Sequence, residues 1–167
     1  MKNISATIKG LITGVLMVAV SIGIYLIKAD FDNSLQYITY AVYVAGIILA
    51  LWDYKKRATG SLTFKNYFTE GFKCFIVVTF LMVLFTFIFS KVDPSMKEQM
   101  GVNYRADLVS KGNYTPAEID SMVQKAKDYF NIMLTSMAIF GYLVIGAMVT
   151  VITSLFLIKQ SKTTTLV

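Results

Sequence analysis

The stretch CFIVVTFLMVLFTFIFS, residues 74–90, decides the fold of this chain. It contains no Asp, Glu, Lys or Arg. As an α-helix it would be about 26 Å long, because each residue adds about 1.5 Å. The hydrocarbon core of a bilayer is about 30 Å thick, so aromatic and Lys residues at the flanks complete the crossing. We therefore predict that this stretch spans a membrane as a helix.

Three further stretches without a charged residue resemble it: residues 10–27, 35–52 and 132–158. The whole chain is 56% hydrophobic and 16% charged, and its mean hydropathy is +0.61. Soluble domains average roughly 45–50% apolar and about 25% charged residues. The sequence predicts one integral membrane domain over residues 1–167, of the all-α class, built as a four-transmembrane-helix bundle.

The first of these stretches is predicted to be a retained span and not a cleaved signal peptide. The opening MKNISATIKG is basic, as a signal peptide requires. The apolar run that follows is longer than a usual signal-peptide core, however. It ends in IYLIKADFDN, which has no cleavage site of small residues.

Lysine and arginine are distributed unevenly between the loops. The loop at residues 91–131 has six basic and six acidic residues, whereas the other side has an excess of basic ones: Lys2, Lys9, Lys55, Lys56, Arg57, Lys65, Lys73, Lys159 and Lys162. Cytoplasmic loops of membrane proteins carry such an excess. We therefore expect both termini in the cytoplasm and residues 91–131 on the extracytoplasmic face. The same rule accounts for the net charge of +6 without a nucleic-acid partner.

The segment before the third span is predicted to be an amphipathic helix at about residues 63–73. Aromatic residues and Gly71 recur there at helical spacing, and polar residues occupy the opposite arc. Thr63 is a plausible N-cap. We interpret the segment as an interfacial helix that turns into the third span. A gating or docking role is the alternative.

This segment, GSLTFKNYFTEGFK at residues 60–73, carries a resemblance. Together with the four spans and the long charged segment between spans three and four, it resembles an uncharacterised Bacteroidota membrane protein family, the domain of unknown function 4199. The resemblance implies a bacterial inner (cytoplasmic) membrane protein whose third loop lies in the periplasm. It implies no activity, and therefore no catalytic residues.

The loop at residues 91–131 is predicted to be a helical hairpin. In its first half Asp93 can cap a helix, Pro94 can take the first helical position, and Gly112 can end it. In its second half Thr115 and Glu118 have the spacing of a capping box. No helix breaker follows before residue 132. The second helix should therefore continue into the fourth span.

The second hairpin helix has one apolar face, which is the candidate partner-docking surface: Ile119, Met122, Val123, Ala126 and Phe130. Something must cover this face. The first hairpin helix, the outer membrane surface or a partner protein are the alternatives.

Small residues within the spans predict close helix contacts. Gly10 and Gly14, then Ala19 and Gly23, recur at the four-residue spacing that lets two helices approach closely. Span four has a stripe of small and polar residues that includes Gly146 and Thr150. Such a stripe either packs helices together or lines a path for a small solute, and we favour packing.

The sequence offers little for catalysis or metal binding. It has no histidine and a single cysteine, Cys74. The predicted spans contain no charged residue, although ion-coupled transport usually needs one. We expect no catalytic residue, no cofactor and no metal site. The predicted function is a non-catalytic subunit or accessory that binds another membrane or envelope protein, or a second copy of itself. The alternative is a pore or carrier for a small neutral or lipid-like molecule.

Overall fold

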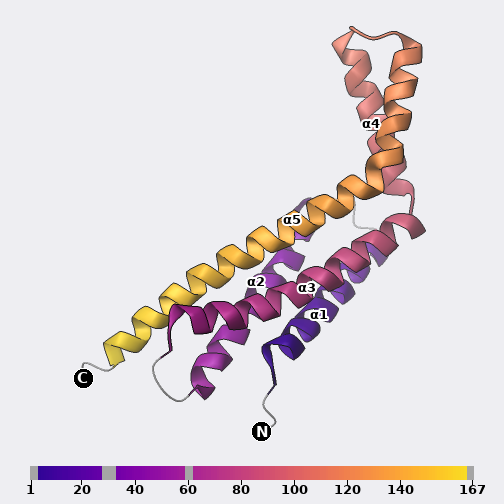
Figure 1. Cartoon of the computed structure of the whole chain (residues 1–167). Coiled ribbons are helices and arrows are strands. Elements are labelled where there is room, and N and C mark those ends of the chain that lie inside the picture. Colours follow the sequence, from indigo (N-terminus) through magenta and orange to yellow (C-terminus); the bar gives the residue numbers. More distant parts are fainter. Residues whose placement is uncertain (1–3, 28–32, 59–61, 165–167) are drawn as a thin grey trace. The chain divides into compact units, whose positions relative to one another are not determined.

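The structure is a computed structural model that describes residues 4–27, 33–58 and 62–164. Within these residues it is helical, with no strand: α1 Ala6–Leu26, α2 Asn33–Arg57, α3 Phe64–Val92, α4 Ser95–Lys111 and α5 Pro116–Thr164 (Figure 1). Four of the helices are long and apolar enough to cross a membrane: Ala6–Leu26, Tyr37–Arg57, Phe64–Val92 and Pro116–Gln160. The predicted all-α class with four spans is confirmed, and the chain is a multi-pass membrane protein.

The chain divides into two compact units, which we describe separately. The bundle unit comprises Met1–Met82 and Ile139–Val167, and the hairpin unit comprises Val83–Ala138. Helices α3 and α5 each contribute to both units.

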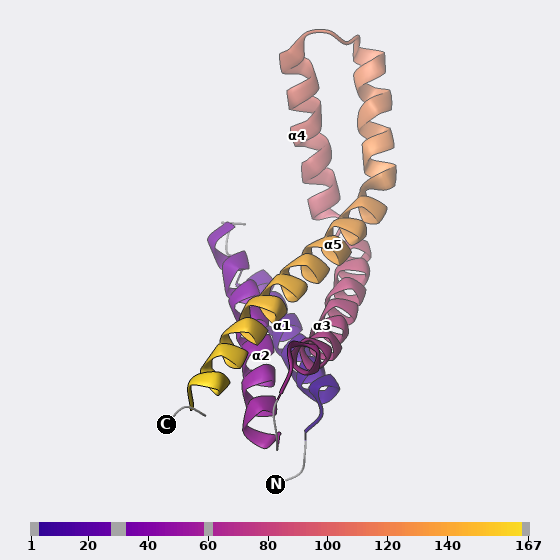
Figure 2. The same ribbon diagram turned by 60° about the vertical axis from the view of Figure 1, so that its left-hand side comes forward.

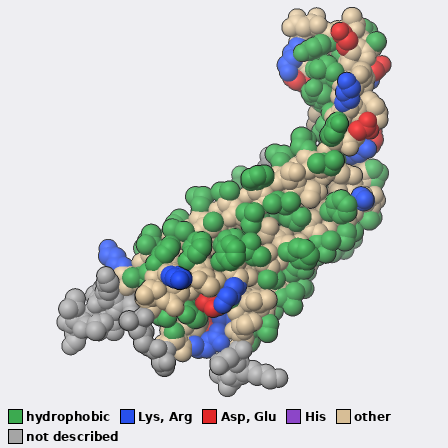
Figure 3. Space-filling model, in the orientation of Figure 1, with side chains coloured by type: hydrophobic (Ala, Val, Ile, Leu, Met, Phe, Trp, Pro, Cys, Tyr) green, Lys and Arg blue, Asp and Glu red, His purple; other side chains and the backbone are tan. Residues whose placement is uncertain are grey.

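In the bundle unit, α1, α2, the first part of α3 and the last part of α5 pack together, as both ribbon views show (Figures 1 and 2). Several large side chains are fully buried between them, among them Met17, Tyr43, Ile47, Tyr67 and Val78. Many large apolar side chains point outward instead and cover the visible face of this unit (Figure 3). An apolar exterior of this extent is the surface that a membrane-embedded protein presents to lipid.

Three helix ends lie together at one end of the bundle unit. The beginning of α1, the end of α2 and the end of α5 meet there. Arg57 donates a hydrogen bond to the Ile4 carbonyl (3.1 Å), and Lys55 donates one to Gln160 Oε1 (2.8 Å). Both ends of the described chain therefore lie at the same end of this unit, as an even number of spans requires.

The segment predicted as an interfacial helix, residues 63–73, forms the first turns of α3. Helix α3 runs from Phe64 to Val92 without interruption. Thr63 N donates to Asn66 Oδ1 (3.1 Å) at its beginning. Tyr67 and Gly71 are buried in the bundle unit, so this face contacts other helices. A position of residues 63–73 in the membrane surface stays a prediction.

The hairpin unit contains α4 and the first part of α5 in antiparallel arrangement (Figure 2). Helix α4 begins at Ser95, one residue later than expected, with Pro94 as its N-cap residue. Asp93 still serves the new helix, because its carboxylate accepts from Ser95 N (2.9 Å). Gly112 ends α4 with a φ of 66°, a left-handed conformation that glycine adopts without steric cost. Helix α5 then runs without a break into the apolar stretch, as predicted.

Candidate functional site

Helix α1 packs against α3 through its first two glycines. A Cβ atom added to Gly10 would lie 2.5 Å from the Cys74 carbonyl oxygen, and one added to Gly14 would lie 2.6 Å from Leu81 Cδ1. Real Cβ atoms do not approach other atoms so closely. The structure places these two candidate packing residues in the helix contact.

Ala19 and Gly23, which continue the same four-residue spacing, lie outside this close contact. Ala19 is exposed, and a Cβ added to Gly23 would have no described atom within 4 Å. The four-residue spacing continues along the helix, but Ala19 and Gly23 do not take part in a close contact of this kind. A helix crossing brings two backbones together over only a few turns, so the pattern alone does not show how far the contact extends.

Helix α5 fits the bundle unit through Gly146 and Thr150. Gly146 faces the Tyr43 hydroxyl and the Phe75 side chain, with no room for a Cβ. Thr150 is fully buried, and its side chain lies against Gly71 of α3. Both residues of span four that we singled out therefore lie in helix contacts.

Two contacts of this kind were not anticipated from the sequence. Thr13 of α1 lies against Gly46 of α2, and Thr150 of α5 lies against Gly71 of α3. In each case the glycine of one helix accommodates the branched side chain of a threonine on another. Gly46 and Gly71 are visible as small residues in the sequence. Nothing in the sequence indicates which threonine each one receives.

The interior of the bundle unit contains hydroxyl groups. Tyr43 Oη donates to the Tyr142 carbonyl (2.9 Å), and the two rings meet edge to face with centroids 5.7 Å apart. Ser154 donates to the Thr150 carbonyl (2.6 Å). The hydroxyls of Tyr67 and Thr150 are buried and have no hydrogen-bond partner among the residues that the structure describes. A neutral hydroxyl set of this kind can hydrogen-bond, but it provides no strong acid or base.

The hairpin unit has its own apolar core, formed by Leu108, Ile119 and Val123, with Tyr104 and Met122 packed against it. The candidate docking face of α5 is thus largely covered by α4, which was one of the three alternatives. Ala126 is half-buried and Phe130 is 7% exposed. Ile119, Met122 and Val123 therefore help to hold the hairpin together, and a docking role of this face stays a prediction.

The beginning of α5 has the predicted capping box. Thr115 N donates to Glu118 Oε2 (2.7 Å), and Glu118 N donates in return to Thr115 Oγ1 (3.4 Å). Two otherwise unpaired backbone N–H groups are satisfied in this way. The short connection after Gly112 and this cap define where α5 starts.

Ion pairs connect the two hairpin helices. Arg105 of α4 pairs with Asp120 of α5, and Lys127 of α5 pairs with Glu98 of α4. The hydrogen bond and positive charge of Lys127 lower the pKa of Glu98. Within α4, Lys111 bonds to Asp107 (2.7 Å), which raises the pKa of Lys111. Ion pairs at exposed positions typically add less than about 1 kcal/mol of stability. The two pairs between α4 and α5 connect the helices at two positions.

No group of three or more His, Cys, Asp or Glu side chains that could hold a metal ion occurs among the residues that the structure describes. Cys74 is buried in the bundle unit. The acidic side chains of the hairpin unit at positions 98, 107 and 120 are each paired with a basic residue.

Comparison with known proteins identifies a family. The model of the family described as "Protein of unknown function (DUF4199)" matches residues 9–159, and the chain therefore belongs to this family. Neither the comparison with curated proteins nor that with solved structures finds a match.

Proposed function

We propose that this DUF4199 protein is a non-catalytic subunit or accessory protein of a bacterial inner membrane, and that it binds another membrane or envelope protein. Both termini lie in the cytoplasm in this proposal, and the hairpin unit lies on the extracytoplasmic side. The basic residues near the start of α1, the end of α2 and the start of α3 support that orientation.

The observation that carries the proposal is the independent packing of the hairpin unit. It has an apolar core of its own, a capping box and two ion pairs between its helices. None of these features is needed to cross a bilayer. A preformed structure outside the spans is well suited to recognition of a partner, because little order has to be gained on binding.

The interior of the bundle unit agrees with a non-transporting role. Its polar stripe is used in contacts so close that Gly46, Gly71 and Gly146 admit no Cβ atom. Such contacts favour a dry, packed bundle over a hydrated path.

Site-specific photo-crosslinking in cells tests the proposal. A photoreactive side chain is introduced at Val102 or Val109, which are exposed on one face of α4 (66% and 60%). We expect a covalent adduct with a distinct membrane or envelope protein. Leu108, which is buried in the hairpin core, is the matched control and should give none. Adducts only with lipid would contradict the proposal, and adducts only with the same chain would make the protein a homo-oligomer.

A pore or carrier for a small neutral or lipid-like molecule is the second candidate. The unpartnered hydroxyls of Tyr67 and Thr150 favour it, because a water or solute would satisfy them. Replacing Thr150 by Cys, with Cys74 replaced by Ala, separates the two functions. A small water-soluble thiol reagent should not modify Thr150→Cys in a dry bundle, and rapid modification would support the pore.

A further inference from the structure

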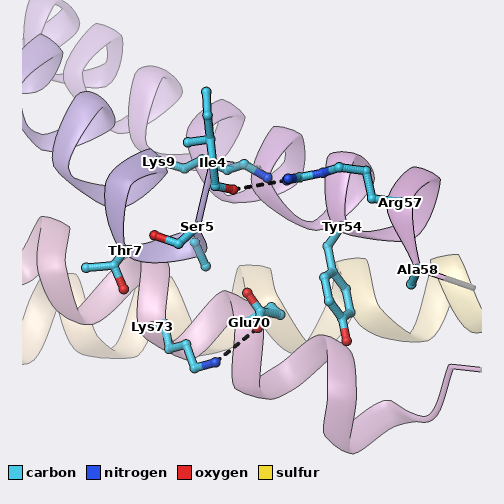
Figure 4. A pocket seen from close by; sticks show the side chains of 10 residues that line it. Ile4, Ser5, Thr7, Lys9, Tyr54, Arg57, Ala58, Glu70 and Lys73 are labelled. Carbon is cyan, nitrogen blue, oxygen red and sulfur yellow. Dashed lines mark hydrogen bonds and ion pairs between the residues drawn. The ribbon is translucent and has the colours of Figure 1, made fainter. Parts of the chain in front are cut away.

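A polar pocket of about 490 Å³ opens at the end of the bundle unit where the beginning of α1 and the end of α2 lie together. It is lined by the first residues of α1, the last residues of α2 and the first part of α3 (Figure 4). The polar and charged side chains of the lining that we consider below are Ser5, Lys9, Tyr54, Arg57, Glu70 and Lys73. Its volume is in the range typical of small-molecule sites, about 300–1,000 Å³.

Among the charged side chains of the lining, cations outnumber carboxylates. The lining includes three cations, Lys9, Arg57 and Lys73, and one carboxylate, Glu70. Asp53, which does not line the pocket, pairs with both Lys9 and Arg57 and so restricts their positions. Lys73 bonds to Glu70 (3.0 Å), and its side chain is 50% exposed. An ammonium group has three N–H donors and a guanidinium has five, so donors remain available for an anion.

The beginning of α1 adds to the positive potential. The first N–H groups of a helix have no partner within it, and they carry a partial positive charge that attracts anions. Ser5 caps this helix by accepting a hydrogen bond from Ile8 N (3.3 Å). The first turn of α1 contains no acidic residue that would neutralise its positive end.

The surroundings indicate which anion fits. Helix α1 is apolar from its second turn onward, and Ile8, Leu11 and Ile12 are exposed on it. Trp52 lies close by in sequence, and Lys56 sits over its ring at 4.7 Å. Aromatic and basic residues together mark the depth of lipid headgroups. A charged group at this depth can be attached to acyl chains that lie along the apolar surface below it.

We infer that this pocket binds the phosphate group of an anionic phospholipid, held between Lys73, Arg57 and the first turn of α1. Glu70 in the lining and Asp53 beside it are the opposing charges that limit the affinity. This site is independent of the proposed accessory function, because it uses no residue of the hairpin unit.

Native mass spectrometry of the purified protein tests the inference. The protein is titrated in neutral detergent with phosphatidylglycerol, and in parallel with phosphatidylcholine of the same chain length. We expect tighter binding of phosphatidylglycerol. Lys73→Ala should weaken it roughly fivefold, the effect expected of one basic residue at an anionic surface. Glu70→Gln should strengthen it, which a misfolded variant would not do.

The matched control is Lys65→Ala. Lys65 is exposed on the same helix outside the pocket, and its replacement changes the net charge equally. Equal weakening by Lys65→Ala and Lys73→Ala would overturn the site, because general attraction would then suffice. No gain with Glu70→Gln would overturn it as well. Soluble glycerol phosphate is added as a competitor. Competition at the affinity of the lipid would support the phosphate site but would assign it to a soluble phosphate ester.

Discussion

At the scale of single residues, close fit between glycines and their neighbours organises the bundle unit. Gly10, Gly14, Gly46, Gly71 and Gly146 each meet an atom of another helix where a Cβ would have to stand. In lipid there is little hydrophobic force between helices, so van der Waals packing of this kind provides much of the attraction. The bundle should therefore be more sensitive to enlarged side chains at these positions than to changes on its apolar exterior.

Gly14→Leu tests this expectation against a matched control on the same helix. A Cβ at position 14 would collide with Leu81, whereas a Cβ at position 23 has no described atom within 4 Å. Both variants gain the same helix propensity, so their difference isolates packing. We expect Gly14→Leu to be less stable than Gly23→Leu by about 1–3 kcal/mol, the usual cost of overpacking. Thermal unfolding in mild detergent measures the difference, and equal midpoints would contradict the packing account.

At the scale of elements, the hairpin unit is held by local signals. Its capping box, its left-handed Gly112 and its small apolar core all lie within Val83–Ala138. Changes in these features should therefore act on the hairpin without unfolding the spans, whose backbone hydrogen bonds close within each helix.

Thr115→Ala removes the side chain that caps α5. Loss of an N-cap typically costs about 1 kcal/mol. The expected result is faster amide hydrogen exchange in the first turn of α5, with unchanged exchange in α1 and α2. Ser121→Ala, at an exposed position of the same helix, is the control. Unchanged exchange around residue 118 in Thr115→Ala would show that the cap does not define this helix start.

The pairing of Glu98 with Lys127 predicts a pH dependence of the hairpin. The folded-state pKa of Glu98 is lowered by the hydrogen bond and charge of Lys127. Its contribution is thus present above the unfolded-state pKa of about 4.3 and is lost as the pH falls through the lower folded-state value. We expect the protection of α4 amides against hydrogen exchange, corrected for the pH dependence of the intrinsic exchange rate, to fall at acidic pH, and to fall less steeply in Glu98→Gln. An identical pH profile for both proteins would contradict the role of this pair.

The sequence predicts elements better than it predicts contacts between them. The ends of the hairpin helices can be predicted because helix caps and left-handed turns depend on nearby residues. The residues that predict them are Gly112, Thr115, Pro116 and Glu118. Helix α4 begins at Ser95, one residue after the predicted start at Pro94. Asp93 lies outside the helix and accepts a hydrogen bond from Ser95 N.

Contacts between distant helices are harder to read. The spacing of Gly10 and Gly14 shows that a close approach is favoured, but it does not identify α3 as the partner helix. It also fails to separate these residues from Ala19 and Gly23. The Gly46–Thr13 and Gly71–Thr150 contacts depend on how four helices are rotated about their axes relative to one another. A short sequence pattern does not predict that rotation. For the same reason, the sequence does not predict that α4, and not the membrane surface or a partner, packs on Ile119 and Val123.

At the scale of the whole molecule, the chain has four candidate spans, basic residues at one end of the bundle unit and a separately packed hairpin. In the topology that we propose, the hairpin unit faces the extracytoplasmic side and the ends of the chain face the cytoplasm. The excess of Lys and Arg near the ends of the chain and in the loop between α2 and α3 supports this orientation, because cytoplasmic loops of membrane proteins carry such an excess.

Thiol accessibility in cells tests this orientation directly. Two single-cysteine proteins are made with Cys74 replaced by Ala: Ser110→Cys, exposed on α4, and Lys65→Cys, exposed near the start of α3. A membrane-impermeant maleimide is added to cells whose outer envelope has been permeabilised. We predict that Ser110→Cys is labelled at once and that Lys65→Cys is labelled only after the inner membrane is broken. Labelling of Lys65→Cys but not of Ser110→Cys while the inner membrane is still intact would contradict this orientation.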